Sequence, residues 1–390
     1  MRWLRRIGLA LLILAVALTA WEPTRVALQT AVMLPSMLGS GPQLLPLLTK
    51  PPQRLSLPYR DSEAAAAGEP DLAELWMPSW ASEDRTAGAM LLVFGVNNLG
   101  RNHPAIVRVA DALARTGVIV LVPDSRTLLA GRLEVGEIDG LVDAFETLAA
   151  RPEVDQDRIG IVGFSVGGSL ALLAAADPSI SGRVRWINAF GAYADAATYL
   201  ASVSAHAYRG AGGEAVPWVP TPLAREVYLR FMLDQVDDPE DRDALDAAFA
   251  DAILAARRPA ADPSVRASLA SEAARTVHDL LTAPSLDAAA AAIERLPDDS
   301  LEFVDAISPA RHLGGMAAEV HLMHETDDHH VPFVESRSLA ASVEERGRLA
   351  AHTEFRLFDH VQPDDLDLAA AAPELWRLLL HVRALMEESL

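Results

Sequence analysis

The stretch Arg158-Ile-Gly-Ile-Val-Gly-Phe-Ser165-Val-Gly-Gly168 decides the fold of this chain. Its first half is an apolar run typical of a strand buried on both faces, and a helical pattern follows at 167–176. Between them lies Gly-x-Ser-x-Gly, which predicts a sharp strand-to-helix turn with Ser165 at its apex, because side chains at the glycines would collide with the adjoining elements. Ser165 is therefore a candidate nucleophile at a helix amino terminus; a plain linking turn is the alternative.

Strand and helix patterns alternate on both sides of this turn. Two short strand-like stretches occupy 54–76, and buried strands are predicted at 89–94, 117–122, 158–163 and 184–190. Helical patterns separate these strands at 104–115, 135–150 and 167–176. Crossovers of this length predict an α/β fold with a mostly parallel, doubly wound sheet.

The alternation breaks in the middle of the chain. Residues 194–305 show helical patterns around 223–233, 242–256, 265–281 and 286–296, with no convincing strand. Alternation then resumes with strands at 319–324 and 352–358 and helices at 333–346 and 373–386. We therefore expect a core in two parts, 54–193 and 306–390, interrupted by a helical cap insertion at 194–305.

The amino terminus has the pattern of a targeting segment. Arg2, Arg5 and Arg6 precede an uncharged run from Ile7 to Trp21, but no clean cleavage site follows. Residues 1–22 are interpreted as a membrane anchor or a cleaved signal, with a buried helix as the third possibility. In the first two cases the arginines stay cytoplasmic and the catalytic part is extracytoplasmic. Residues 23–53 are rich in proline and predict a stalk rather than one continuous helix.

The composition excludes several classes of partner. The chain has 54 acidic and 33 basic residues, a net charge of −21, so it lacks the basic surface that nucleic acid requires. The same imbalance argues against a polybasic attachment to anionic lipid, so any membrane attachment must be through the apolar terminus. The absence of cysteine excludes disulfides and thiolate metal sites. Nothing in the sequence indicates an oligomeric state.

A nucleophilic serine needs a base and an acid that orients it, on loops after later strands. Acidic residues follow the strand that ends at His324, and Asp359-His360 follow the strand predicted to end at Phe358. We expect His360 to be the base, because no other histidine follows a predicted strand at the right place. A surface histidine is the alternative. The dense segment 324–330 could also be read as a metal cluster, but consecutive residues on a short loop rarely converge on one ion. We expect neither a metal nor a cofactor.

With these residues the chain resembles the α/β-hydrolases, nearest the dienelactone hydrolase and acyl-peptidase-like esterase branch, over roughly residues 88–192 and 305–388. The family pattern H-G-x-x-D-x-x-V-P, laid on His324 to Pro332, implies Asp328 as the triad acid. Glu325 replaces the family glycine, which keeps Asp327 as the runner-up. The family histidine after the last strand matches His360.

The resemblance also bears on the oxyanion hole. The family has H-G-x after its first buried strand, where this chain has Phe94-Gly95-Val96. The N–H of Val96 is the expected donor, with Asn97 next, and the N–H of Val166 is the second donor. An ordinary glycine-containing turn is the alternative for this loop.

The resemblance implies a serine hydrolase that cleaves carboxylic esters, small or lipid-like, without a cofactor. A peptidase or an acyltransferase would use the same triad, and a non-catalytic binding protein of the same fold is the alternative from another class. The cap would lie over the site as a lid. Its apolar residues could line an acyl pocket or form the lid's own core: Trp218, Val219, Tyr228, Phe231 and Met232.

Overall fold

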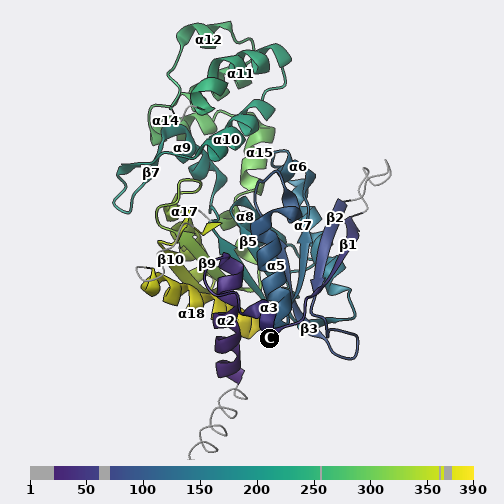
Figure 1. Ribbon diagram of the computed structural model, residues 1–390. Coiled ribbons are helices and arrows are strands. Elements are labelled where there is room, and N and C mark those ends of the chain that lie inside the picture. The colour runs from purple at the N-terminus through teal and green to yellow at the C-terminus, as the bar shows by residue number, and fades with distance from the viewer. Residues whose placement is uncertain (1–21, 61–70, 255–256, 360–361, 364–370) are drawn as a thin grey trace, which may run out of the picture.

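A central eight-stranded sheet organises the computed structural model, which describes residues 22–60, 71–254, 257–359, 362–363 and 371–390 (Figure 1). The strand order is β1-β2-β4-β3-β5-β6-β9-β10. β2 pairs antiparallel with β1 and β4, and the remaining neighbours are parallel. The strands span β1 Gln53–Arg60, β2 Asp71–Met77, β3 Ala87–Val93, β4 Ile119–Pro123, β5 Val154–Phe164, β6 Trp186–Phe190, β9 Glu319–Glu325 and β10 Leu349–Phe355. The predicted α/β-hydrolase sheet is confirmed.

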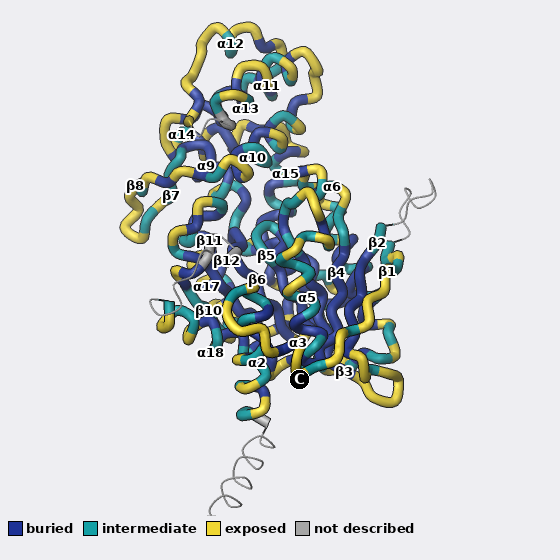
Figure 2. The backbone as a smooth tube through the Cα atoms, viewed as in Figure 1, coloured by how far each residue is buried: buried dark blue, intermediate teal, exposed yellow. Residues whose placement is uncertain are grey.

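Helices cover both faces of this sheet. On one face α7 (Gly136–Ala149), α8 (Val166–Ala175) and α17 (Phe333–Glu344) share a buried cluster with alternate strand residues such as Leu91 and Ile161. On the other, α2 (Glu22–Leu38), α5 (Pro104–Thr116) and α18 (Ala372–Ser389) pack on Leu92 and Val162. β3, β4 and β6 are buried along their whole length and are dark blue in Figure 2, whereas the edge strand β1 is mostly exposed. Short helices complete the core: α3 Leu45–Leu48, η1 Gly100–Asn102, α6 Arg126–Leu129, α16 Pro309–His312 and η2 Leu313–Gly315.

The proline-rich segment after residue 22 packs on the body of the molecule. Residues 22–38 form α2, which continues through Pro35 and lies against α5 and α18. α3 follows after a break at Gly39 and Gly41, both of which have positive φ. Within the residues that the structure describes, no helix combines the length and the apolar character needed to cross a bilayer.

The last strand ends earlier than the sequence predicts. β10 stops at Phe355, and β11 (Phe358–Asp359) pairs separately with β12 (Gln362–Pro363), so the predicted strand 352–358 is wrong at its carboxyl end. The N–H of Leu357 donates to Glu325 Oε2 at 2.6 Å, and the N–H of Thr326 donates to the Phe355 carbonyl at 2.9 Å. These bonds turn the chain at Arg356 and Leu357 instead of extending the ladder.

A lid of helices stands above the carboxyl ends of the strands (Figure 1). It contains α9 (Ala196–Ala205), α10 (Pro222–Asp234), α11 (Pro239–Leu254), α12 (Pro263–Ser268), α13 (Glu272–Leu281), α14 (Leu286–Ile293) and α15 (Asp298–Ala306). These helices bury a core of their own, which includes Leu229, Met232, Leu245 and Val277. The lid also holds a small hairpin, β7 (Ala207–Arg209) with β8 (Ala215–Pro217). The expectation of no strand in this region was wrong, because three-residue strands are too short to show a periodic pattern.

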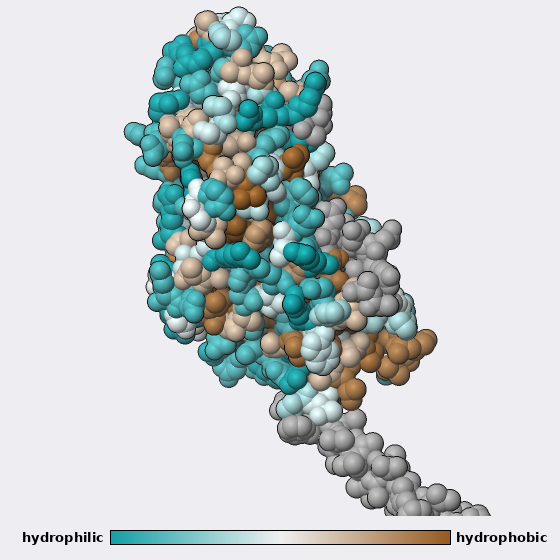
Figure 3. Space-filling view, turned by 90° about the vertical axis from the view of Figure 1, so that its left-hand side faces the viewer, coloured by the Kyte–Doolittle hydropathy of each residue, from teal (hydrophilic) through white to brown (hydrophobic). Residues whose placement is uncertain are grey.

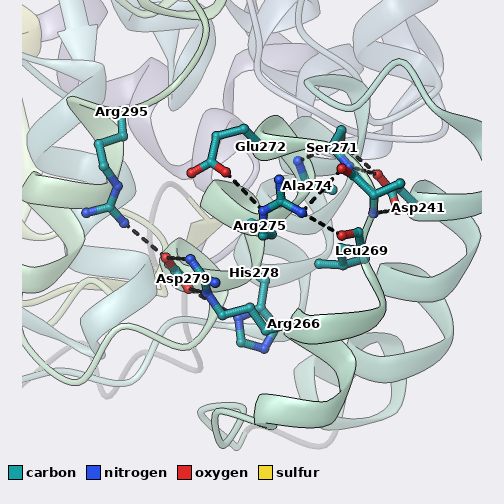
Figure 4. A network of polar contacts seen from close by, with 11 residues as sticks. Asp241, Arg266, Leu269, Ser271, Glu272, Ala274, Arg275, His278, Asp279 and Arg295 are labelled. Carbon is teal, nitrogen blue, oxygen red and sulfur yellow. Dashed lines mark hydrogen bonds and ion pairs between the residues drawn. The ribbon is translucent and has the colours of Figure 1, made fainter.

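A polar network explains why the helix predicted at 265–281 is in fact two helices, α12 and α13 (Figure 4). Asp241 of α11 accepts the N–H groups of Ala270 and Ser271, each at 2.8 Å, and the Ser271 hydroxyl at 2.7 Å. These two N–H groups therefore bond to α11 and not to carbonyl groups of one continuous helix. Ser271 begins α13 as its amino-terminal cap. Asp279 then joins α12 to α13 through Arg266, at 2.7 and 3.1 Å.

Candidate functional site

Ser165 occupies a strained turn between β5 and α8. Its backbone has φ 55° and ψ −137°, a conformation that non-glycine residues rarely adopt. The N–H of Ser165 donates to the Phe190 carbonyl at 2.7 Å, and the Ser165 carbonyl accepts the N–H of Gly168 at 2.8 Å. The surrounding structure thus holds a serine side chain at the carboxyl edge of the sheet, in the position of a nucleophile elbow.

The two glycines of the motif are required by close packing. A Cβ added to Gly163 would lie 2.5 Å from the carbonyl oxygen of Gly167, and one added to Gly167 would lie 2.7 Å from the backbone of Phe94. Both distances are shorter than the closest approach of two non-bonded heavy atoms. The turn therefore fits between β5, α8 and the end of β3 only without side chains at these positions.

The loop after β3 runs beside Ser165. A Cβ added to Gly95 would lie 2.9 Å from Ser165 Cβ and 3.2 Å from Ser165 Oγ. Asn97 holds this loop through its side chain: Nδ2 donates to the Gly95 carbonyl at 3.3 Å, and Oδ1 accepts the N–H of Leu99 at 3.0 Å. Val96 follows Gly95, and Val166 is the first residue of α8, where N–H groups have no intrahelical acceptor. The structure places both predicted donors next to the serine.

Asp328 is buried on the loop after β9, whereas Asp327 is exposed. Its Oδ1 accepts the N–H groups of His330 at 2.6 Å and Val331 at 3.0 Å, and Oδ2 lies 3.3 Å from Nε2 of His324. The loop thus fixes Asp328, and not Asp327, inside the protein.

His360 lies outside the described residues, so its position relative to Asp328 and Ser165 is not described. The chain that leads to it is fixed by Glu325, the residue that stands in place of the family glycine. Glu325 is buried, and its two carboxylate oxygens accept the N–H groups of Asp327 at 3.2 Å and Leu357 at 2.6 Å. The departure from the family pattern therefore joins the Asp328 loop to Leu357, three positions before residue 360.

The lid is bonded directly to the Asp328 loop. The indole N–H of Trp218 donates to the Asp328 carbonyl at 2.7 Å, and the N–H of Thr221 donates to the His329 carbonyl at 2.8 Å. His329 is exposed, and its Nδ1 lies 2.9 Å from the Val219 carbonyl. These bonds hold the start of α10 above the site.

A cavity of about 380 Å³ lies between Ser165 and the lid. It is lined mainly by apolar side chains, and no carboxylate lines it among the residues described. Of the lid residues proposed from sequence, Tyr228 and Phe231 line it, Trp218 and Met232 belong to the lid core, and Val219 is half exposed. Other apolar lining residues are Ile106, Val109, Leu133, Leu200, Leu223 and Val227.

Two tyrosines in the cavity wall were missed by the sequence analysis. Tyr193 and Tyr199 stack with their ring centroids 5.4 Å apart, and the Tyr199 hydroxyl donates to the His330 carbonyl at 3.0 Å. The Tyr193 hydroxyl is buried and has no hydrogen-bond partner among the described residues. Burial raises the pKa of the Tyr193 hydroxyl, so it stays protonated and can donate. Its place just after the carboxyl end of β6 was the signal available in the sequence.

Comparison with known proteins supports the fold described above. Residues 92–214 match the family model described as the dienelactone hydrolase family. A dipeptidyl-aminopeptidase-IV-like protein from Bacteroides ovatus superposes with a TM-score of 0.51 and 13% identity, over 87% of this chain and 36% of that one. The chain therefore has the α/β-hydrolase fold. No curated protein matches its sequence.

Two further solved structures resemble this chain. The acylaminoacyl peptidase of Pyrococcus horikoshii has a TM-score of 0.49 and 12% identity, over 88% of this chain and 42% of that one. Esterase 2 of Thermogutta terrifontis has a TM-score of 0.45 and 14% identity, over 84% of this chain and 94% of that one. The chain spans about a third of the length of the Bacteroides protein.

Proposed function

We propose that this α/β-hydrolase is a serine esterase that cleaves carboxylic esters through an acyl-enzyme. The observation that carries the proposal is the position of Ser165, in a strained turn beside the Gly95 loop and open to an apolar cavity of about 380 Å³. An apolar cavity of this size suits the hydrocarbon part of an ester.

The mechanism assigns Ser165, His360 and Asp328 to a triad. Ser165 Oγ attacks the ester carbonyl carbon while its proton passes to His360, and Asp328 orients the imidazole. The N–H groups of Val96 and Val166 stabilise the tetrahedral oxyanion. Collapse expels the alcohol with the proton from His360. Water then attacks the acyl-enzyme by the same route and releases the carboxylic acid.

A peptidase is the second candidate, because the Bacteroides protein of the same fold is named for aminopeptidase activity. An aminopeptidase must hold the cationic amino terminus of its substrate, which calls for a carboxylate in the site. Since no carboxylate lines the cavity among the described residues, the observations favour an uncharged ester.

We also propose that residues 1–22 attach the protein to a membrane and place the hydrolase outside the cytoplasm. The support is the arrangement of Arg2, Arg5 and Arg6 before the uncharged run Ile7–Trp21.

Labelling with a fluorophosphonate tests the esterase proposal. The wild-type protein should label and hydrolyse p-nitrophenyl esters, and Ser165→Ala should do neither. Comparing short and long acyl esters with aminoacyl p-nitroanilides separates esterase from aminopeptidase. A folded wild-type protein that neither labels nor turns over any of these substrates contradicts both and supports a binding protein.

A further inference from the structure

A group of large apolar side chains lies exposed at the base of the molecule. Leu44, Leu47 and Leu48 at α3, together with Trp80 in the turn between β2 and β3, are here named the basal patch. Leu47 is 81% exposed and Leu48 is 70% exposed, while Leu44 and Trp80 are 48% and 38% exposed. Single exposed apolar residues are ordinary, but several together mark a surface that contacts another apolar phase.

Contacts on either side of α3 place the basal patch at the amino ends of the parallel strands. Arg115, near the end of α5, donates from Nη1 to the Thr49 carbonyl at 3.4 Å. A Cβ added to Gly117, which precedes β4, would lie 3.4 Å from the Trp80 ring and 3.4 Å from the side chain of Leu390. Ser165 follows the carboxyl end of β5, so the patch and the nucleophile are at opposite edges of the sheet.

The described chain also begins at this base. α2 descends to the lowest point of the coloured ribbon in Figure 1, and Figure 3 shows brown side chains gathered at the same lower end of the molecule. Val26, in the first turns of α2, and Leu45 of α3 belong to one buried cluster. The 21 residues that precede α2 include the uncharged run Ile7–Trp21 and therefore join the molecule beside the basal patch.

We propose that the basal patch seats on a lipid bilayer, so that the mouth of the catalytic cavity faces away from the membrane. The inference rests on the proposed attachment through residues 1–22. Leucines fit the hydrocarbon boundary, and tryptophan favours the headgroup level, where its ring is apolar and its N–H is hydrated. Arg85, whose guanidinium lies 4.2 Å from the centre of the Trp80 ring, is suited to the same level.

Charge does not drive this seating. Lys50 and Arg85 near the patch are offset by Glu83 and Asp84 in the same turn as Trp80, and residues 21–390 carry 30 basic against 54 acidic side chains. The contact is therefore apolar, and it does not require anionic lipid.

The orientation limits which substrates can arrive. β3 has seven residues, so the base and the catalytic mouth are separated by roughly 23 Å at about 3.3 Å per residue. A lipid held in the bilayer below the base does not reach Ser165 from there. The substrate class is therefore an ester that reaches the lid from the aqueous phase.

Because the chain has no cysteine, single cysteines can test this orientation in the full-length protein. Leu47→Cys and Leu48→Cys report on the patch, and Leu12→Cys reports on the terminal apolar run. The matched control is Val135→Cys, an exposed apolar residue that immediately precedes α7, in the connection from the carboxyl end of β4. Each variant is labelled with an environment-sensitive fluorophore and reconstituted in uncharged phosphatidylcholine vesicles with brominated acyl chains.

Fluorophores at 12, 47 and 48 should lose most of their emission to bromine quenching, and the one at 135 should keep its emission. Quenching at 12 without quenching at 47 and 48 overturns the seating, as does quenching at 135. If the fluorophore at 47 is already shielded from water in the absence of vesicles, a second copy of the protein covers the basal patch. That result also overturns the proposed contact with the bilayer. Fluorophosphonate labelling of the same samples reports the esterase separately, since Leu47, Leu48 and Val135 are not among the described residues that line the cavity.

Discussion

The main chain at Gly95 passes so close to Ser165 that a Cβ at Gly95 would lie 2.9 Å from Ser165 Cβ. Gly95→Ala must therefore displace the loop that carries Val96. We expect kcat/KM for ester hydrolysis to fall about 10²- to 10³-fold, the usual effect of losing one oxyanion donor. The matched control is Gly182→Ala, because a Cβ there meets no atom within 4 Å. A Gly95→Ala enzyme with wild-type rates would exclude Val96 as the donor.

Replacing each of two adjacent aspartates identifies the triad acid. Asp328→Asn removes a buried carboxylate and should lower kcat about 10⁴-fold, because the base loses its orienting charge. Asp327→Asn changes an exposed side chain and should leave kcat within a few-fold of wild type. Steady-state hydrolysis of one ester by both variants provides the comparison. A large loss in Asp327→Asn with little change in Asp328→Asn would reverse the assignment.

The sequence was most informative where structure depends on local pattern. The buried run of β5, the glycines around Ser165 and the helix after it are adjacent in the chain, so their spacing predicts the turn directly. The same reasoning predicts the alternation of parallel strands and crossover helices, because the residue periodicity reveals the buried face of each element.

Features that depend on distant residues could not be predicted in this way. The end of β10 is set by Glu325, some thirty residues earlier, and the break before α13 is set by Asp241 in another helix. The stacking of Tyr193 on Tyr199 of α9 joins the loop after β6 to the lid, and the sequence analysis had no signal for that contact. The part played by His360 stays a prediction from the sequence.

Arg225 in the lid should be a source of instability. It is only 2% exposed, and its three guanidinium nitrogens have no hydrogen-bond partner among the described residues. A buried cation without a counter-ion costs free energy that an apolar side chain does not. Arg225→Met should therefore raise the free energy of unfolding by about 1–3 kcal/mol.

Urea denaturation of Arg225→Met and wild type measures this gain. Arg230→Met is the control in the same helix, because Arg230 is exposed and bonds Glu226 and the Ala130 carbonyl, each at 2.6 Å. It should give no gain. A less stable Arg225→Met protein would mean that Arg225 holds an anion in solution.

Two buried histidines should make the protein sensitive to acid. Burial lowers the pKa of His321 to about 4, and burial together with the neighbouring His321 and His352 lowers the pKa of His381 to about 3. The rings of His321 and His381 lie 5.8 Å apart. Since both pKa values are about 6.5 in the unfolded chain, these groups contribute their full stability above pH 6.5 and lose it as the pH falls toward 4 and 3.

His321→Phe should reduce this sensitivity. At pH 5 the unfolded chain binds a proton at each histidine that the folded protein does not, a loss of about 2 kcal/mol per residue relative to pH 7.5. The variant should lose about 2 kcal/mol less than wild type over that interval, as measured by urea midpoints at the two pH values. An equal loss in both proteins would show that His321 is not the acid-sensitive group.

The lid and the sheet bury separate cores, and the cavity takes one wall from each. Mutations in α10 can therefore remodel the wall that faces the substrate while the turn around Ser165 is inherited unchanged. Related proteins can in this way differ in the substrate they bind while they keep the same catalytic chemistry. Lineages that share this hydrolase should then differ most along residues 194–305 and least around the serine.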